Sequence, residues 1–345
     1  MEYSKKDYEN KTDKTDNTDT IPLSKFLDDD EESDDSEDNT IIRLPPKNNV
    51  IHKPIIGNRP LTDYMFASTN NYDFKSWQKC FPDNQVLLRK LLFNTSWNNF
   101  FDIVERKPYF KNMEKILSKT VADKKNLILP HGELVFNAFN ILSLKQIKVV
   151  FIGQDPYPGT NIVNDKNIPE AMGLCFSVPH NYPKAKSLKN IYANLKAFNH
   201  IKDEPQGGCL AMWVLQGCLM INSSFTTLVG QKNVHSDLWA NFSYDLISYL
   251  NTKLSNIVFI AWGSSAHKLC KDINPNKHCI ITSSHPSPLS AHSTLNGVIY
   301  GPVKDEAKRK RVTYPSFESS DHFGRINTYL KEVNKPQIIW DLIDI

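Results

Sequence analysis

An acidic residue follows a run of apolar residues in the segment VVFIGQDPYPG, Val149 to Gly159. The apolar run ends at Gly153, and Asp155 stands between that glycine and Pro156. Glycine, aspartate and proline are common in turns, so the segment could be a turn and nothing more. The prolines also stiffen the backbone, and a fixed carboxylate is what electrostatic catalysis at a developing positive charge requires. This segment alone leaves both interpretations open.

Three further apolar segments are expected to be strands that end in polar residues: Leu219–Asn222 before Ser223, Ile257–Trp262 before Gly263 and Ser264, and His278–Thr282 shortly before His285. Continuous apolar strands alternating with helices, with Lys148–Ile152 as the first strand, predict an α/β fold with a parallel sheet covered on both faces. Ligands bind at the carboxyl ends of such strands. An acid, an amide, hydroxyls and a histidine are therefore expected at one rim.

The helices that must lie between these strands are indicated by apolar residues at helical spacing. The expected helices are 86–104, a helix capped by Ser187 and running through LKNIYANLKAF, 237–250 and 264–270.

Charge divides the chain into an acidic beginning and a basic body. The whole chain holds 41 basic and 38 acidic residues, and residues 1–40 hold 5 and 15 of them, which leaves 36 basic and 23 acidic residues. The acidic stretch is too polar to bury a core, so 1–40 is predicted to be a disordered extension. Residues 41–76 are expected to be a linker or partly ordered lead-in, and 77–345 a single globular domain. A basic body favours a polyanionic partner such as nucleic acid.

Several classes of protein are disfavoured by composition. No apolar run reaches the ~18 residues of a membrane helix, and the N-terminus has no apolar signal segment, so an intracellular protein without a membrane partner is expected. The six cysteines are scattered without a CxxC pair, which favours reduced thiols and no metal site.

Five motifs occur in order: GQDPYP, GLCFSV, the pattern LxxWxxQGxLxxN from Leu210 to Asn222, AWGS and HPSPLS. Together they closely resemble the family 1 uracil-DNA glycosylases over roughly residues 85–345. The resemblance implies a monomeric enzyme without cofactors that removes uracil from DNA. It also implies a single catalytic domain, 77–345, with a central four-stranded parallel sheet flanked by helices.

The resemblance further implies roles for matching residues. Asp155 would orient or activate water, and His285 would support the departing uracil anion. Four residues would bind uracil: Gln154, Tyr157, Phe176 and Asn222. Seven would contact DNA: Pro183, Ser187, Gly263, Ser264, Ser287, Leu289 and Ser290.

Physical chemistry supports these roles independently of the resemblance. Breaking a glycosidic bond makes the sugar cationic and the base anionic, so a carboxylate and a neutral imidazole are suitable partners. An amide such as that of Asn222 can distinguish uracil from cytosine by hydrogen bonding. Rejecting the extra methyl of thymine needs a rigid obstacle, and Tyr157 can be one. A flipped base leaves a gap that an apolar wedge such as Leu289 can fill.

The sequence departs from the family pattern at three places. Pro158 stands where many members have histidine, which predicts weaker engagement of DNA. About eight extra residues follow Gly159, and a basic insertion lies at about 294–320. The KDEAKRKR stretch in that insertion could contact DNA, act as a nuclear signal, or be a solvated loop.

Partners and alternatives remain open from the sequence. The expected substrate is uracil-containing DNA, single- or double-stranded, and the acidic tail could bind a protein or only aid solubility. The place of action would be the nucleus or a viral replication site, or otherwise the cytoplasm. A replication scaffold of the same fold with subordinate or lost catalysis is the main alternative. A nucleotide enzyme is disfavoured because GxxxxGK and GxGxxG are absent, and a glycosylase for mismatched thymine is disfavoured by Tyr157.

Overall fold

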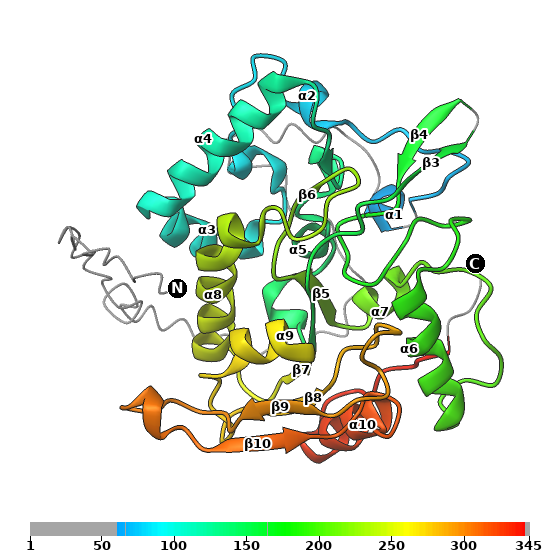
Figure 1. The fold of residues 1–345 in the computed structure, drawn as a ribbon, viewed down its shortest axis with the longest axis vertical. Coiled ribbons are helices and arrows are strands. Elements are labelled where there is room, and N and C mark those ends of the chain that lie inside the picture. The colour runs from blue at the N-terminus through cyan, green and yellow to red at the C-terminus, as the bar shows by residue number, and fades with distance from the viewer. Residues whose placement is uncertain (1–60, 66, 164, 342–345) are drawn as a thin grey trace, which may run out of the picture. The chain divides into compact units, whose positions relative to one another are not determined.

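Four parallel strands form the central sheet, in the order β5-β2-β7-β8, in a computed structural model that describes residues 61–65, 67–163 and 165–341 (Figure 1). The sheet strands are β2 (Val149–Gly153), β5 (Cys218–Asn222), β7 (Val258–Trp262) and β8 (Cys279–Ser283). Strands β2 and β7 are buried at every residue, β5 at all but its last residue and β8 at its last three residues, as expected for a sheet with helices on both faces. The predicted α/β fold with its parallel sheet is confirmed.

The remaining strands pair in antiparallel twos, β1 with β6, β3 with β4 and β9 with β10. They are β1 (Ile128–Leu129), β3 (Thr160–Val163), β4 (Lys166–Pro169), β6 (Thr227–Leu228), β9 (Leu295–Val298) and β10 (Arg311–Tyr314). The extra residues after Gly159 form the β3–β4 hairpin, and the insertion at 294–320 contains the β9–β10 hairpin.

Helices surround the sheet and connect its strands. The α-helices are α1 (Leu61–Met65), α2 (Trp77–Cys80), α3 (Asn98–Val104), α4 (Pro108–Asp123), α5 (Asn137–Ile141), α6 (Lys186–Ala197), α7 (Ala211–Leu215), α8 (Ser236–Lys253), α9 (Gly263–Cys270) and α10 (His322–Glu332). Short 3₁₀ turns are η2 (Leu88–Leu91), η3 (Thr95–Trp97), η4 (Gly132–Leu134), η5 (Leu144–Gln146) and η6 (Glu306–Lys308).

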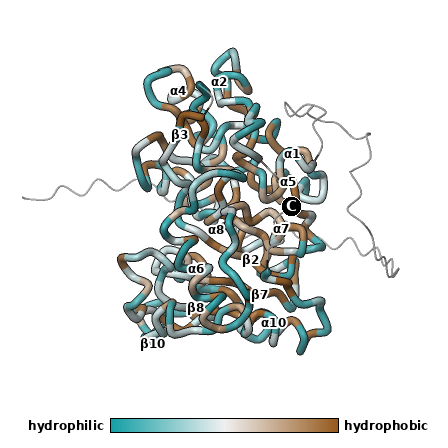
Figure 2. The backbone as a smooth tube through the Cα atoms, turned by 90° about the vertical axis from the view of Figure 1, so that its right-hand side faces the viewer, coloured by the Kyte–Doolittle hydropathy of each residue, from teal (hydrophilic) through white to brown (hydrophobic). Residues whose placement is uncertain are grey.

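Aromatic side chains hold the sheet against α7 and α10. The ring of Phe151, in β2, lies 5.9 Å from that of Trp213 in α7, and the ring of Phe323 in α10 lies 5.8 Å from Trp213. Trp340 packs edge-on against Trp213 at 5.1 Å. Figure 2 shows hydrophobic stretches of the chain around β2, α7 and β7. Burying such rings contributes about 2–3 kcal/mol each, so the strands that carry the polar rim are firmly positioned.

The predicted helix over 86–104 is wrong, because the structure divides it into η2, η3 and α3. The side chain of Asn94 accepts hydrogen bonds from the backbone and hydroxyl of Ser96, and its amide donates to the carbonyl of Phe139. An asparagine that bonds its own neighbouring backbone in this way competes with helix continuation.

The predicted N-cap at Ser187 is also wrong. Helix α6 begins at Lys186 and its N-cap is Ala185, which makes no side-chain cap. Ser187 is therefore the second residue of the helix, and its half-buried hydroxyl lies in the first turn. Backbone N–H groups of a first turn have no partner within the helix.

Part of the predicted lead-in packs against the rest of the described residues. Tyr64 donates a hydrogen bond to the carboxylate of Glu133, and its carbonyl accepts one from Asn137. Phe74 is buried and its ring lies 5.9 Å from that of Tyr64. The predicted extension at 1–40 and the part of the lead-in at 41–60 lie outside the described residues.

Candidate active site

The parallel register of the central sheet brings the predicted reactive segments, which follow its strands, to one rim. Gly153, the last residue of β2, is paired with Asn222, the last residue of β5. Trp262 at the end of β7 is paired with Ser283 at the end of β8. Neighbouring strands lie about 4.8 Å apart. Strands β2 and β8 lie on either side of β7. The segments that follow these two strands therefore start about 10 Å from each other.

Asp155 is held in place by a backbone N–H from a distant part of the chain. The N–H of Asn233 donates to Asp155 Oδ2 at 2.7 Å. Burial raises the pKa of Asp155 above its ordinary value, while the Asn233 hydrogen bond and the charge of Lys232 act in the opposite direction. The carboxylate is thus fixed by a directional donor in a partly desolvated position, where its charge acts strongly on nearby groups.

His285 is neutral, and one of its ring nitrogens is already taken. The N–H of Ser287 donates to His285 Nδ1 at 3.0 Å, which places the ring proton on Nε2. Burial lowers the pKa of His285 to about 4, so the imidazole is uncharged near neutral pH. The donor available at Nε2 is therefore the N–H of an uncharged ring.

Two glycines set how closely the polar side chains approach the strand ends. A Cβ at Gly153 would lie 2.2 Å from Asn222 Oδ1, so only glycine leaves room for that amide. Gly263 has φ of +83°, and a Cβ there would lie 2.9 Å from Cβ of His285. Both glycines are therefore required by the geometry of the site.

Phe176 connects Tyr157 to His285. Its backbone is left-handed, with φ of 63°, although the side chain is almost fully buried. Its ring centroid lies 5.8 Å from that of His285, and its carbonyl accepts a hydrogen bond from the Tyr157 hydroxyl at 3.4 Å. A bulky residue in this conformation is strained and persists only where its surroundings enforce it. Burial also raises the pKa of Tyr157, which keeps its hydroxyl neutral.

Gln154 makes contacts different from those expected of a uracil-binding side chain. Its side-chain amide donates to Asn233 Oδ1 at 2.9 Å. Its carbonyl accepts from the hydroxyl of Ser223 and the N–H of Ser224. Contact between Gln154 and a bound base would thus come from its backbone.

The loop after β8 presents Leu289 to solvent. This side chain is 95% exposed, an unusual state for leucine. The loop beneath it is ordered, because Ser290 donates its hydroxyl to the carbonyl of His285 and the N–H of Leu289 donates to the Ser287 hydroxyl. The amide of Asn190 in α6 donates to the carbonyl of Pro286 at 2.8 Å, which ties α6 to the loop.

The other predicted DNA contacts lie at the beginnings of two helices. Ser187 is in the first turn of α6, and Pro183 is exposed shortly before it. Gly263 begins α9, and the side chain of Ser264 is exposed there. Helix N-termini favour anions such as phosphate.

The family model described as the uracil DNA glycosylase superfamily matches residues 139–312. The chain is also 51% identical over 296 residues to a probable uracil-DNA glycosylase of Acanthamoeba polyphaga mimivirus, with 86% of this chain and 76% of that protein covered. The chain belongs to the uracil-DNA glycosylase superfamily.

Other similar proteins agree with this assignment of the glycosylase. A uracil-DNA glycosylase of Blochmanniella floridana is 36% identical over 248 residues, covering 72% of this chain and 98% of that protein. The crystal structure of mimivirus uracil-DNA glycosylase matches with a TM-score of 0.78 at 51% identity, over 83% of this chain and 100% of that chain. Variants of that mimivirus enzyme were solved in complex with UGI. The predicted function, a DNA repair glycosylase, is confirmed.

The glycosylase has further residues at the site that sequence patterns did not single out. Lys232 and Asn233 approach Asp155, and the buried His235 is hydrogen-bonded through Nδ1 to the hydroxyl of Thr226. The stretch VGQKNVH looks like an ordinary polar turn. Its only signal was a glycine and an asparagine three positions apart, two residue types that tolerate a left-handed backbone.

The described residues give no sign of a membrane segment or metal centre in the glycosylase. Among them, no helix is long and apolar enough to cross a bilayer. Within the same ranges, no group of three or more histidine, cysteine, aspartate or glutamate side chains could hold a metal ion.

Proposed function

We propose that this glycosylase hydrolyses the N-glycosidic bond of deoxyuridine in DNA with Asp155 and His285 as its catalytic residues. The observation that carries the proposal is the neutral His285, whose Nδ1 accepts the Ser287 N–H and whose Nε2–H is free to act as the donor. Asp155, two residues after the end of β2, supplies a negative charge from the same rim of the sheet.

The two residues act on opposite ends of the breaking bond. As the C1′–N1 bond lengthens, the sugar becomes cationic and the bonding electrons leave with the base. The Asp155 carboxylate stabilises the cation and accepts a proton from the water that adds to C1′. The Nε2–H of His285 donates to the base carbonyl on which negative charge develops. The uracil anion then takes up a proton and Asp155 releases the one it accepted, so the products are free uracil and an abasic site.

Uracil selection is assigned to Asn222, Phe176 and Tyr157. The amide of Asn222 donates to one carbonyl of the base and accepts from its N–H, which cytosine cannot match. Phe176 lies beside His285 and provides the stacking face. Tyr157, fixed by its hydrogen bond to Phe176, blocks the position where thymine has a methyl group. A methyl in an apolar pocket alone gives only about 1–3 kcal/mol of discrimination, so a rigid obstacle is needed.

DNA is held by the exposed residues around this pocket. Leu289 enters the base stack in place of the extruded nucleotide, which offsets part of the lost stacking. The hydroxyls of Ser187, Ser264 and Ser287 contact phosphates. The hydroxyl of Ser290 already donates a hydrogen bond to the backbone carbonyl of His285, so Ser290 contributes mainly by fixing the shape of the loop.

We also propose an oligomeric state, a form of DNA substrate, a place of action and a role for residues 1–40. The enzyme acts as a monomer on single- or double-stranded DNA, inside cells, in a nucleus or viral replication site or otherwise in the cytoplasm. The acidic residues 1–40 bind a protein partner or aid solubility. Light scattering checks the first point: a mass near 39.5 kDa supports a monomer, and twice that mass contradicts it.

Release of free base from oligonucleotides tests the catalytic assignment. We expect release of uracil, but not of cytosine or mismatched thymine. Asp155→Asn should slow uracil release by about 10²–10⁴-fold while DNA binding persists. Asp203→Asn, at an exposed acid in the loop between α6 and α7, is the control and should be fully active. Absence of uracil release by the unsubstituted protein, or full activity of Asp155→Asn, would contradict the proposal.

A further inference from the structure

The segment 230–233 is hydrogen-bonded along its length to the loop that carries Asp155. The N–H of Gly230 donates to the carbonyl of Pro158 at 2.9 Å. The N–H of Asn233 donates to Asp155 Oδ2 at 2.7 Å, and Gln154 Nε2 donates to Asn233 Oδ1 at 2.9 Å. These three bonds join residues that are more than 70 positions apart in the chain, and one of them ends on the reactive carboxylate itself.

Asn233 has the backbone conformation that this contact requires. Its φ is 60°, in the left-handed region that asparagine tolerates better than other residues with a side chain. This conformation turns the N–H of Asn233 toward Asp155, while its side-chain oxygen accepts a hydrogen bond from the amide of Gln154. Asn233 thus contacts two consecutive residues of the loop with two different groups.

The segment is anchored at both ends, so it can hold Asp155 rather than follow it. The hydroxyl of Thr227 donates to the carbonyl of Gln231. On the other side, Trp239 donates its indole N–H to the Thr226 hydroxyl, and the same hydroxyl is hydrogen-bonded to Nδ1 of His235. Buried side chains with satisfied hydrogen bonds are rigid.

We propose that Asn233 is a positioning residue for catalysis: its backbone N–H fixes the Asp155 carboxylate, and its side chain locks the adjacent Gln154. The inference rests on the proposed role of Asp155 in uracil release. Asn233 touches neither DNA nor water in this mechanism and acts only through Asp155 and the loop around it.

Three charged or titratable groups lie around the contact between Asn233 and Asp155: Lys232, Glu170 and His235. Lys232 is exposed, and its charge opposes the effect of burial on the pKa values of both Asp155 and Glu170. Burial lowers the pKa of His235 to about 4, so this histidine is neutral in the working range. A hydrogen bond to the ionised carboxylate favours ionisation. Loss of the Asn233 bond therefore raises the pKa of Asp155 and moves the acid limb of the rate profile to higher pH.

Two variants separate the backbone contact from the side-chain contact. Replacing residue 233 by its α-hydroxy analogue turns the Lys232–Asn233 peptide bond into an ester, which removes the N–H and keeps the side chain. Asn233→Gly removes the side chain and keeps a residue that tolerates positive φ. Asn199→Gly, at another exposed asparagine with φ of 59°, is the matched control.

The measurements are single-turnover release of uracil between pH 4.5 and 8.5 and steady-state kinetics, which give KM. For the ester we expect an acid limb shifted upward by about one pH unit and a slower plateau, with KM unchanged. Asn233→Gly should slow the plateau severalfold, and Asn199→Gly should match the unsubstituted enzyme. An unshifted acid limb in the ester, or an effect confined to KM, would overturn the inference. If the unsubstituted protein released no uracil, that result would contradict the proposed function itself and not only the role of Asn233.

Discussion

At the scale of single residues, close approach at the strand ends decides what the site can do. Asn222 reaches its position because Gly153 has no side chain, and His285 reaches its position because Gly263 has none. The tautomer of His285 is set by one backbone N–H, that of Ser287. Small groups around the reactive side chains thus determine the chemistry as much as those side chains do.

Gly153→Ala tests the first of these contacts. The new methyl would lie 2.2 Å from Asn222 Oδ1, so the amide must move away from the base. Displacements of about 1 Å at a reacting site cost about 10²-fold in rate, and we expect a loss of this size in kcat/KM for uracil release. Circular dichroism and thermal unfolding check that the variant is folded. A folded variant with normal kcat/KM would contradict the role given to Asn222.

The protonation state of His285 can be observed directly. Burial lowers its pKa to about 4, so the ring should stay neutral from pH 8 down to about pH 5, with the proton on Nε2. The ¹⁵N chemical shifts of the ring report both properties, and His285→Gln identifies the signals. A midpoint near 6.5, or a proton on Nδ1, would show that the proposed donor is wrong.

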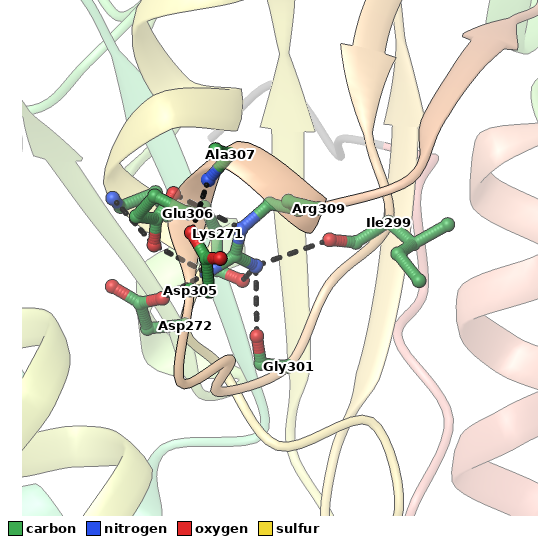
Figure 3. A network of polar contacts seen from close by, with 8 residues as sticks. All are labelled: Lys271, Asp272, Ile299, Gly301, Asp305, Glu306, Ala307 and Arg309. Atoms are coloured by element: carbon green, nitrogen blue, oxygen red, sulfur yellow. Dashed lines mark hydrogen bonds and ion pairs between the residues drawn. The ribbon is translucent and has the colours of Figure 1, made fainter.

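At the scale of elements, the basic insertion is fastened to α9 by a buried arginine. Arg309 donates to the carboxylates of Asp272 and Glu306 and to the carbonyls of Lys271, Ile299 and Gly301 (Figure 3). Only 7% of the residue is exposed. One cation of the stretch KDEAKRKR therefore has a structural role, which was not among the three alternatives that the sequence offered for this stretch: contact with DNA, a nuclear signal or a solvated loop.

Arg309→Ala should loosen this insertion. The change removes the hydrogen bond to the buried carbonyl of Gly301 and two ion pairs, so we expect the free energy of unfolding to fall by about 2–4 kcal/mol. Lys308→Ala, at a side chain that is 84% exposed, is the matched control and should change little. Urea denaturation measures both. Equal stability of the two variants would show that Arg309 does not fasten the insertion.

Some elements follow from sequence and others do not, for physical reasons. The four sheet strands were predictable because they are buried on both faces and read as continuous apolar runs. The break at Asn94 was not, because its local bonds to Ser96 are combined with a contact to Phe139 across the fold, which the sequence pattern does not show. The role of Asn233 was hidden for a similar reason, since it uses a backbone N–H that almost every residue has.

At the scale of the whole molecule, buried neutral histidines link folding to pH. Burial lowers the pKa values of His131, His235, His285 and His322 to about 4 each. Between pH 4 and 6.5 the unfolded chain then binds more protons at these positions than the folded one. Their contribution to stability is complete above about pH 6.5 and is lost as the pH falls toward 4. Burial of Glu114, which raises its pKa to about 7, acts in the opposite direction.

The net effect is a protein that acid destabilises. Each histidine contributes a slope of up to about 1.4 kcal/mol per pH unit, and Glu114 cancels about one of the four. We therefore expect the free energy of unfolding to fall by several kcal/mol between pH 7 and pH 5, measured by urea denaturation. A free energy that is constant or rises over this range would show that the histidines are not neutral in the folded state.

The most direct test of the central claim is a crystal structure with DNA that carries a deoxyuridine analogue joined to its sugar by a carbon–carbon bond, which the enzyme cannot hydrolyse. The account predicts the base outside the helix, with Asp155 beside C1′, His285 Nε2 within hydrogen-bonding distance of a base carbonyl, and Leu289 in the vacated stack. A base bound elsewhere, or a pocket in which Asp155 and His285 face different groups, would contradict it.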